Sequence, residues 1–383
     1  MIKPEDFYGE MNKNGLAYFT GVPDSLLKSF CAYVSDFTFA GNHVIAANEG
    51  GAVGLAIGYH LATGNTPVVY LQNSGLGNAI NPLLSLADQK VYGIPMVLLI
   101  GWRGEITRDG QQLKDEPQHK KQGQVTEAML TAMGISYKII DADTKDYPAI
   151  LAEMTVEAKS SSQPVALLVR KGTFAPYHLR MGDTPELGGL KRLSRERAIA
   201  LLVDKMPDAS FVVSTTGMAS RELYELRSQK KQGHEKDFLV VGGMGHASQI
   251  ACEMSRRSEK EIYCLDGDGA FLMHMGSTAL NAAGKFCHIV LNNQVHDSVG
   301  GQPTAASGID IPAIALACGY QAAETVETEA DLIHAMDMLT DFKKKGSCLL
   351  EVRVIPGARK DLGRPGLSSQ ELKSKNMKYL GSI

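Results

Sequence analysis

Short apolar segments alternate along this chain with stretches of helical character, and this alternation constrains the fold more than any other feature. Residues 43–47 (HVIAA), 67–72 (PVVYLQ) and 95–101 (PMVLLIG) are typical of strands, and residues 50–63 (GGAVGLAIGYHLAT) of a helix. Strands that are apolar along their whole length are buried on both faces, as in parallel sheets covered by helices. The same alternation resumes at 209–215, 238–243, 261–269, 288–293 and 347–355. The sequence therefore predicts an α/β protein with two parallel sheets, each covered by helices in an α/β/α domain.

A stretch rich in glycine and proline separates the two sets of segments. Residues 171–193 lack apolar periodicity and contain the run TPELGG, which is typical of a linker. We predict a first domain over residues 1–170, a linker over 171–193, and a second domain over 194–383 that ends in a C-terminal tail. Ser194 stands where the N-cap of the next helix is expected.

Composition excludes several classes of protein. The chain has 383 residues, 44% of them hydrophobic, and a formal net charge of -3. This length suffices for two domains, and this charge provides no basic field for nucleic acid. No apolar run reaches the length of a membrane span, and the polar opening is unlike a signal peptide. Six scattered cysteines without C-x-x-C spacing are typical of reduced thiols. We expect a cytoplasmic protein with no nucleic-acid or membrane partner.

Polar residues follow two neighbouring strands of the predicted second domain. Asp268 lies in the sequence GDG, and 22 residues separate that motif from the pair Asn292–Asn293. Ligands of open parallel sheets bind beyond the carboxyl ends of the strands, where both motifs fall. Carboxylate and amide oxygens suit Mg²⁺, and flanking glycines let a diphosphate approach the backbone. Each motif alone is weak and could be a simple turn, but together they favour a metal and diphosphate site.

The spacing of GDG and NN resembles the cofactor motif of thiamine-diphosphate enzymes. The resemblance implies that Asp268, Asn293 and the carbonyl of Val295 hold Mg²⁺ together with diphosphate oxygens. It also implies a set of residues that contact the cofactor itself: Thr216, Gly217, Met218, Gly242, Met244, Gly267, Gly269 and Ala270. A helix cap formed by Ser214 or Thr215 is the alternative for residues 214–218. The segment 240–248 superficially suggests a dinucleotide site, but Ser248 occupies the position of the third glycine.

Glu49 lies between a predicted strand and an apolar helix start. Desolvation at such a position raises the pKa of a carboxyl group. A turn acid that caps the helix is the alternative interpretation. In thiamine-diphosphate enzymes, the matching glutamate hydrogen-bonds N1' of the aminopyrimidine and assists removal of the C2 proton. The resemblance therefore implies that the first domain binds the pyrimidine and the second binds the diphosphate.

Further segments narrow the resemblance. Larger relatives carry a central domain between the other two, which this chain lacks. The segments 21–27 (GVPDSLL), 115–123 (DEPQHKKQG), 296–304 (HDSVGGQPT) and 358–365 (ARKDLGRP) resemble the decarboxylases of 3-phosphonopyruvate, with those of sulfopyruvate as close relatives. The implied reaction converts 3-phosphonopyruvate to phosphonoacetaldehyde and CO₂. Sulfopyruvate decarboxylation and carboligation of two keto acids are the alternatives. The family also implies a homodimer or larger oligomer with active sites between chains.

Acid–base and substrate-binding residues are less well determined by the sequence. Asp24 and His119 match positions that line the sites of related decarboxylases, although a structural role is about as well supported for each. A dianionic phosphonate requires cationic partners. The candidates for substrate binding are Arg103, Arg108, Lys114, Lys120 and Lys121 in the loop 101–123, Arg359 and Arg364 in the tail, and His296, with His246 on a second loop near the cofactor. The sequence does not choose among them.

Overall fold

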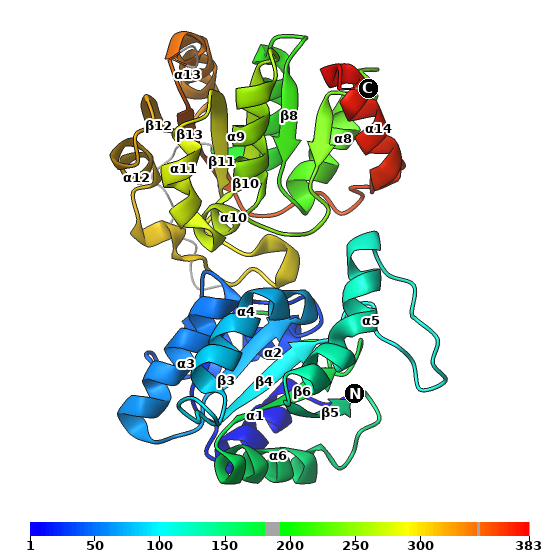
Figure 1. Ribbon diagram of the computed structural model, residues 1–383. Helices are drawn as coiled ribbons and strands as arrows, with labels where there is room; N and C mark the ends of the chain where they lie inside the picture. The colour runs from blue at the N-terminus through cyan, green and yellow to red at the C-terminus, as the bar shows by residue number, and fades with distance from the viewer. Residues whose placement is uncertain (181–191, 343–344, 383) are drawn as a thin grey trace. The chain divides into compact units, whose positions relative to one another are not determined.

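The computed structural model describes residues 1–180, 192–342 and 345–382. The chain divides into two compact units. The N-terminal unit comprises residues 1–182 with 296–303, and the C-terminal unit comprises residues 183–295 with 304–383. Each unit contains one sheet with helices on both of its faces (Figure 1). The prediction of two parallel-sheet α/β domains is therefore confirmed. Residues 181–191, which make up much of the predicted linker, lie outside the described residues.

Six described strands form the sheet of the N-terminal unit, in the order β2-β1-β3-β4-β6-β5. All of its pairings are parallel. The strands are β1 (Phe19–Gly21), β2 (His43–Ile45), β3 (Val68–Gln72), β4 (Met96–Gly101), β5 (Ser136–Ile140) and β6 (Pro164–Val169). The helices are α1 (Pro4–Lys13), α2 (Lys28–Phe37), α3 (Glu49–Thr63), α4 (Leu76–Pro82), α5 (Pro117–Ala132) and α6 (Tyr147–Ser161).

The central strands of this sheet are buried on both faces because alternate side chains enter two separate cores. Val68 and Tyr70 pack with α1, α2 and α6, whereas Val69 and Leu71 pack with α3, α4 and α5. This alternation follows from the two-residue period of a strand. It explains why β3 and β4 are continuously apolar in sequence.

Seven described strands form the sheet of the C-terminal unit, in the order β12-β13-β11-β10-β8-β9, with β7 paired to β13. The strands are β7 (Leu193–Ser194), β8 (Phe211–Ser214), β9 (Asp237–Leu239), β10 (Ile262–Gly267), β11 (Phe286–Asn292), β12 (Ala322–Val326) and β13 (Cys348–Ile355). The helices are α7 (Arg195–Lys205), α8 (Met218–Gln229), α9 (Ala247–Arg257), α10 (Asp268–Met273), α11 (Thr278–Asn281), α12 (Ile311–Ala317), α13 (Glu329–Phe342) and α14 (Ser369–Leu380).

Helices cover both faces of the second sheet as well. Helices α7, α8 and α13 pack on the face that carries Tyr263 and Leu265, and α9 packs on the face that carries Ile262 and Cys264. The hydroxyl of Ser194 accepts a hydrogen bond from Arg197 N–H, so the predicted cap of α7 is confirmed. Within the part of the chain that the structure describes, no helix is both long and apolar enough to cross a membrane.

Candidate active site

Glu49 is the first residue of α3, beyond the carboxyl end of β2. The cap of this helix is Asn48, whose side-chain oxygen accepts a hydrogen bond from Gly51 N–H at 2.7 Å. Glu49 Oε2 instead accepts a hydrogen bond from Asn78 Nδ2 at 2.7 Å, and only 6% of the residue is exposed. Burial raises the pKa of the Glu49 carboxyl, although the bond from Asn78 opposes that shift. The group is therefore suited to share a proton with a neighbouring base.

Gly75 allows the carboxyl group of Glu49 to occupy this position. A Cβ atom at Gly75 would stand 2.6 Å from both Cγ and Cδ of Glu49, which is closer than real Cβ contacts. Gly75 and Asn78 thus enclose the carboxyl group from the segment that follows β3. Sequence reasoning missed both residues, because a glycine and an asparagine near the start of a helix carry no specific signal.

Asp24 lies at the carboxyl ends of three neighbouring strands. Its carboxylate accepts hydrogen bonds from Gln72 Nε2 at 2.7 Å and from the N–H groups of Leu26 and Leu27 at 2.6 and 3.0 Å. A Cβ at Gly101 would collide with it, so the end of β4 is also in contact. Asp24 has no exposed surface, and burial raises its pKa. Its three donors make it a fixed, buried group that connects β1, β3 and β4.

Arg103 and His119 join Asp24 in one cluster of the N-terminal unit. Arg103 donates to Asp115 through Nε at 2.8 Å and Nη2 at 2.5 Å, and through Nη1 to Ser25 Oγ at 2.9 Å. His119, in the first turn of α5, is 9% exposed. Burial, together with the nearby charge of Arg103, lowers the pKa of His119 to about 4. The imidazole is therefore neutral at neutral pH, and its Nδ1 has no hydrogen-bond partner among the described residues.

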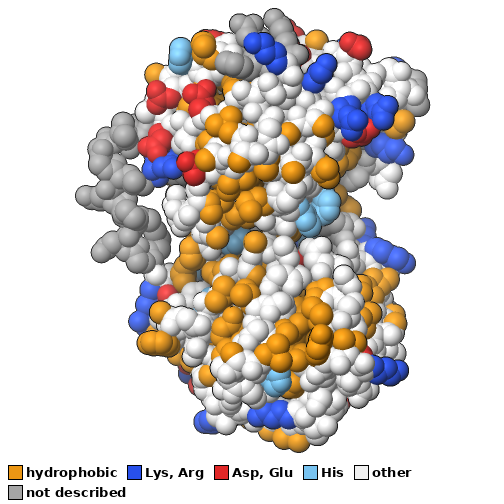
Figure 2. All heavy atoms as spheres, turned by 60° about the vertical axis from the view of Figure 1, so that its left-hand side comes forward, with side chains coloured by type: hydrophobic (Ala, Val, Ile, Leu, Met, Phe, Trp, Pro, Cys, Tyr) orange, Lys and Arg blue, Asp and Glu red, His pale blue; other side chains and the backbone are white. Residues whose placement is uncertain are grey.

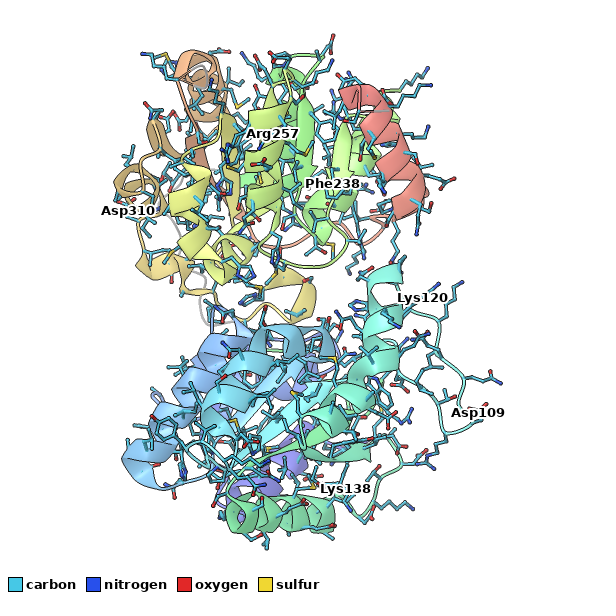
Figure 3. The ribbon with its side chains drawn as sticks, in the orientation of Figure 1. Asp109, Lys120, Lys138, Phe238, Arg257 and Asp310 are labelled. Atoms are coloured by element: carbon cyan, nitrogen blue, oxygen red, sulfur yellow. The ribbon has the colours of Figure 1, made fainter. Side chains whose placement is uncertain are left out.

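The other basic candidates do not gather at this cluster. The side chain of Arg108 is 82% exposed and pairs with Asp141 at 2.8 Å. Lys114, Lys120, Lys121 and Arg364 are exposed. Figure 3 shows Lys120 on α5 and Asp109 on a loop that extends away from the sheet. Arg359, in the C-terminal unit, contacts Glu196, Glu225 and Asp361. Arg103 is thus the candidate cation that lies beside Asp24 and His119 in the N-terminal unit.

Asp268 and Asn293 meet at one edge of the second sheet. Strands β10 and β11 are parallel, with Gly267 opposite Leu291, so the two motifs end side by side. Asp268 is the first residue of α10. Burial raises the pKa of its carboxylate to about 6, although hydrogen bonds from the Thr304 side chain and from the backbone of Gly269 and Asn293 oppose that shift. Only 3% of Asp268 is exposed.

Thr304 is a third member of this edge that sequence reasoning missed. Its hydroxyl donates a hydrogen bond to Asp268 Oδ2, and its N–H donates to the carbonyl of Gln294 at 2.8 Å. A threonine at the end of a loop gives no sequence signal of such a contact. The segment between Asn293 and Thr304 is consequently held at both ends beside Asp268.

The two asparagines of the NN pair have different partners. Asn292 Nδ2 donates to Glu351 Oε1 on β13 at 2.6 Å, which ties β11 to its neighbour. Asn293 Oδ1 accepts a hydrogen bond from Val295 N–H at 3.1 Å. Gln294, which lies between Asn293 and Val295, has a φ of 63°, a conformation that non-glycine residues rarely adopt. This backbone turn keeps Asn293 and Val295 at the edge occupied by Asp268.

The remaining predicted cofactor residues lie on loops at the same ends of neighbouring strands. Thr216 Oγ1 donates to the carbonyl of Val241 at 3.0 Å, which joins the loop after β8 to the loop after β9. Gly217, with a φ of 95°, precedes Met218 at the start of α8. No side-chain cap is made there, and the hydroxyls of Ser214 and Thr215 are buried without a partner among the described residues. Gly242 and Met244 are half-buried on the second loop, and Gly267, Gly269 and Ala270 surround Asp268.

The loop 295–303 connects the edge at Asn293 to Thr304. His296 N–H donates to the carbonyl of Gln302 at 2.8 Å, so the loop closes on itself. Burial lowers the pKa of His296 to about 4. His246 lies on a different loop, the one before α9. The centroid of its ring is 4.5 Å from that of the His274 ring.

A buried polar cluster lies beneath the Asp268 edge. Cys264, Asp266 and His288 place one potential ligand atom each within 4.8 Å of the others. His288 has both ring nitrogens engaged, by Asp266 Oδ2 and by the hydroxyl of Tyr320, each at 3.3 Å. Asp266 Oδ1 accepts a hydrogen bond from Gly267 N–H at 3.0 Å. The cluster therefore supports the strand end that carries Asp268.

The donors at the Asp268 edge fit a divalent metal and a diphosphate. The carboxylate of Asp268 is buried and its pKa is raised, which a bound cation reverses. The oxygens available there, from one carboxylate, one amide and backbone carbonyls, are those that Mg²⁺ prefers. The hydroxyl of Thr215, for which the described part of the chain provides no hydrogen-bond partner, lies in the segment between β8 and α8, where a phosphate would find a donor.

Comparison with known proteins extends these observations to the whole chain. Residues 5–128 match the family described as "Thiamine pyrophosphate enzyme, N-terminal TPP binding domain", and residues 214–352 match its C-terminal TPP binding domain. Phosphonopyruvate decarboxylases from Streptomyces viridochromogenes and Streptomyces hygroscopicus are 32% and 34% identical, over 97% of this chain and 93% and 92% of theirs. Sulfopyruvate decarboxylase from Methanosarcina acetivorans is 29% identical, over 88% of this chain and 87% of its own.

Proposed function

Because this chain belongs to the thiamine pyrophosphate enzymes, we propose that it decarboxylates 3-phosphonopyruvate to phosphonoacetaldehyde and CO₂, with thiamine diphosphate and Mg²⁺ as cofactors. The observation that carries the proposal is the likeness to two phosphonopyruvate decarboxylases, which spans nearly all of each chain. Sulfopyruvate decarboxylation is the second candidate, because a sulfopyruvate decarboxylase is also similar over most of its length.

The C-terminal unit would hold the metal and the diphosphate. Asp268, Asn293 and the carbonyl of Val295 would be the protein ligands of Mg²⁺. The loops that carry Thr216, Gly217 and Met218 and the glycines around Asp268 would donate N–H and hydroxyl groups to phosphate oxygens. Gly242 and Met244 would contact the rings of the cofactor. When bound, thiamine diphosphate supplies an electron sink for the pair released as CO₂ leaves.

The N-terminal unit would supply the acid–base groups. Glu49, with its raised pKa, would share a proton with N1' of the aminopyrimidine. His119 is neutral, and its Nδ1 has no hydrogen-bond partner among the described residues, so it can hold or deliver a proton near the substrate. Asp24 has no exposed surface, and we assign it the role of positioning Arg103 and Gln72. Arg103 would contribute the positive charge that a phosphonate requires.

We propose a homodimer or larger oligomer in which active sites form between chains. An apolar surface of the N-terminal unit supports this, and Figure 2 shows apolar side chains gathered there. On α3, Leu55 and Leu61 are 39% and 69% exposed, and Cβ atoms at Gly54 and Gly58 would meet open space. Leu84, Leu86 and Tyr92 add exposed apolar area after α4. Such a surface is typical of an interface, and a second copy of this chain is the partner it fits in this family.

The test is CO₂ release from phosphonopyruvate, sulfopyruvate and pyruvate, each supplied separately with Mg²⁺ and thiamine diphosphate. We expect the highest kcat/KM for phosphonopyruvate and an aldehyde as the product. A preference for sulfopyruvate would select the second candidate, and equal rates on pyruvate would exclude a phosphonate-specific enzyme. A product that contains two joined keto-acid residues would show carboligation instead.

A further inference from the structure

Glu351, on β13, is a buried acid whose two carboxylate oxygens both accept hydrogen bonds. Asn292 Nδ2 donates to Oε1 at 2.6 Å, and Thr325 Oγ1 donates to Oε2 at 2.5 Å. Only 2% of Glu351 is exposed. Nε of Arg353, two residues along the same strand, lies 3.8 Å from Oε1. The pairing of β11, β12 and β13 therefore brings this acid against the last residue of β11, all within the C-terminal unit.

The carboxylate of Glu351 determines which way the amide of Asn292 faces. A carboxylate can only accept hydrogen bonds, so it selects the Nδ2 end of the amide. The Oδ1 end then faces the backbone, where it accepts a hydrogen bond from Gln294 N–H at 3.0 Å. The reversed amide would set Oδ1 against an acceptor and Nδ2 against an N–H donor. Glu351 thus acts on the chain beyond β11 through one side chain.

The bond from Asn292 holds a turn that is unfavourable by itself. Gln294 has a φ of 63°, and a non-glycine residue stays in such a conformation only where its surroundings hold it. Its N–H is held by Asn292, and its carbonyl accepts a hydrogen bond from Thr304 N–H at 2.8 Å. Asn293 and Val295 flank Gln294, so their positions depend on these two bonds.

We infer that Glu351 is a positioning residue of the proposed metal site and that it acts through Asn292. This role rests on the proposed function, because it takes Asn293 and the carbonyl of Val295 to be ligands of Mg²⁺. Residues that orient metal ligands affect metal affinity nearly as strongly as the ligands do. Mg²⁺ requires near-ideal octahedral geometry, whereas Ca²⁺ accepts longer and more variable distances. Loss of the positioning should therefore weaken Mg²⁺ binding more than Ca²⁺ binding.

Glu351→Met tests this role, since methionine has a similar length and removes both acceptors. The affinity for Mg²⁺, measured by calorimetry with thiamine diphosphate present, should fall about tenfold to a hundredfold. The affinity for Ca²⁺ should fall less. Glu351→Gln should bind both ions nearly as the wild type does, because its Oε1 can still accept a hydrogen bond from Asn292. Glu324→Met, the same substitution at an exposed position of β12, is the matched control.

A double variant separates positioning from a contribution to stability alone. Either Glu351→Met or Asn292→Leu leaves a buried polar group without its partner, so each single variant should unfold at a lower temperature than the wild type. Combining the two replaces both partners with apolar groups, which removes most of that cost. We expect the unfolding temperature of the cofactor-free protein to recover in the double variant. Its affinity for Mg²⁺ should stay as low as in Asn292→Leu, because the N–H of Gln294 still lacks the Asn292 oxygen.

Several outcomes would overturn the inference. Wild-type Mg²⁺ affinity in Glu351→Met would exclude it directly. Equal losses for Mg²⁺ and Ca²⁺, or a Mg²⁺ affinity that recovers together with stability in the double variant, would show that Glu351 only stabilises the sheet. A further loss on adding Glu351→Met to Asn292→Leu would show that it does not act through Asn292. If the wild-type enzyme releases no CO₂ from any of the keto acids, the proposed reaction fails, whereas the calorimetry still reports on Glu351.

Discussion

The hydroxyl of Thr304 donates a hydrogen bond to Oδ2 of Asp268, so one carboxylate oxygen is oriented before any metal binds. Thr304→Val keeps the shape of the side chain and removes this donor. We expect the affinity for Mg²⁺ to fall about tenfold to a hundredfold, the usual effect of losing a partner that orients a metal ligand. Calorimetric titration of Mg²⁺ in the presence of thiamine diphosphate measures it. Thr304→Ser should stay near the wild type, and equal affinities for the valine and serine variants would contradict the prediction.

Glu49→Gln should separate cofactor binding from proton transfer. Glutamine keeps a hydrogen-bonding side chain but cannot share a proton with the ring nitrogen, so deprotonation at C2 of thiamine diphosphate should slow greatly. The affinity for the cofactor should change little. Exchange of the C2 proton for deuterium, followed by NMR after an acid quench, measures the rate. A wild-type exchange rate would exclude Glu49 from this role.

Gly75→Ala should displace the same carboxyl group without removing it. The new Cβ would stand 2.6 Å from Cδ of Glu49, so either the carboxyl group or the backbone must shift. We expect C2 exchange and kcat to fall at least tenfold, because a misplacement of about 1 Å has effects of this order. Gly77→Ala is the control, since a Cβ there meets nothing within 4 Å. Similar losses in the two variants would point to a general effect on α4 instead.

His43 should make the protein less stable in acid. Its Nε2 lies 2.8 Å from the hydroxyl of Tyr70, and burial lowers its pKa to about 4, below the value near 6.5 that it has in the unfolded chain. Between these values the unfolded chain binds more protons, so stability decreases as the pH falls from about 6.5 towards 4, by roughly 1–3 kcal/mol for this group.

Thermal unfolding of the cofactor-free protein at pH 7, 6 and 5 measures this effect. His43→Gln should reduce the pH dependence without abolishing it, because the pKa values of His119 and His296 are also lowered to about 4. An unchanged slope in the variant would show that His43 is protonated in the folded protein at pH 5.

Active sites formed between chains predict complementation. Glu49→Ala and Asp268→Ala chains should each be nearly inactive alone. In a two-fold dimer, a mixed pair would contain one intact site and one site with both changes. Random pairing makes about half of the dimers mixed, so co-expressed chains should recover about a quarter of wild-type activity. A purified mixed dimer that is no more active than its parents would place both residues in a site within one chain.

The sequence predicted the fold where buried strands are largely apolar, as in β3, β4, β10, β11 and β13. It missed edge strands such as β5 and β12, whose partly exposed residues break the apolar pattern. The predicted strand at 238–243 extends only from Asp237 to Leu239, because the following apolar residues turn into the loop that carries Gly243 and Gly245, both at positive φ. Strand β6 was not among the predicted segments, although its residues are apolar throughout, as expected of a buried strand.

The sequence predicted those residues of the candidate site that lie in recognisable motifs. Asp268 and Asn293 follow adjacent strands and could be paired from topology alone. The residues that hold them, such as Thr304, and those that enclose Glu49, such as Gly75 and Asn78, are ordinary in sequence and gain meaning only from their contacts. Both Arg103 and Arg359 carry the positive charge expected of a residue that binds a phosphonate, so the sequence alone does not distinguish them. The structure separates them, because three carboxylates already surround Arg359.

The order of strands also bears on how the chain folds during synthesis. The sheet of the N-terminal unit is complete at Val169, so it can form while the ribosome is still producing the rest of the chain. In the C-terminal unit, β13 lies between β11 and β12 and also pairs with β7, more than 150 residues earlier. Its sheet therefore cannot close until residue 355 has emerged, and parallel pairings of such long sequence separation form slowly. Nascent chains of this protein should thus pass through a stage in which the first sheet has formed and the second still lacks β13.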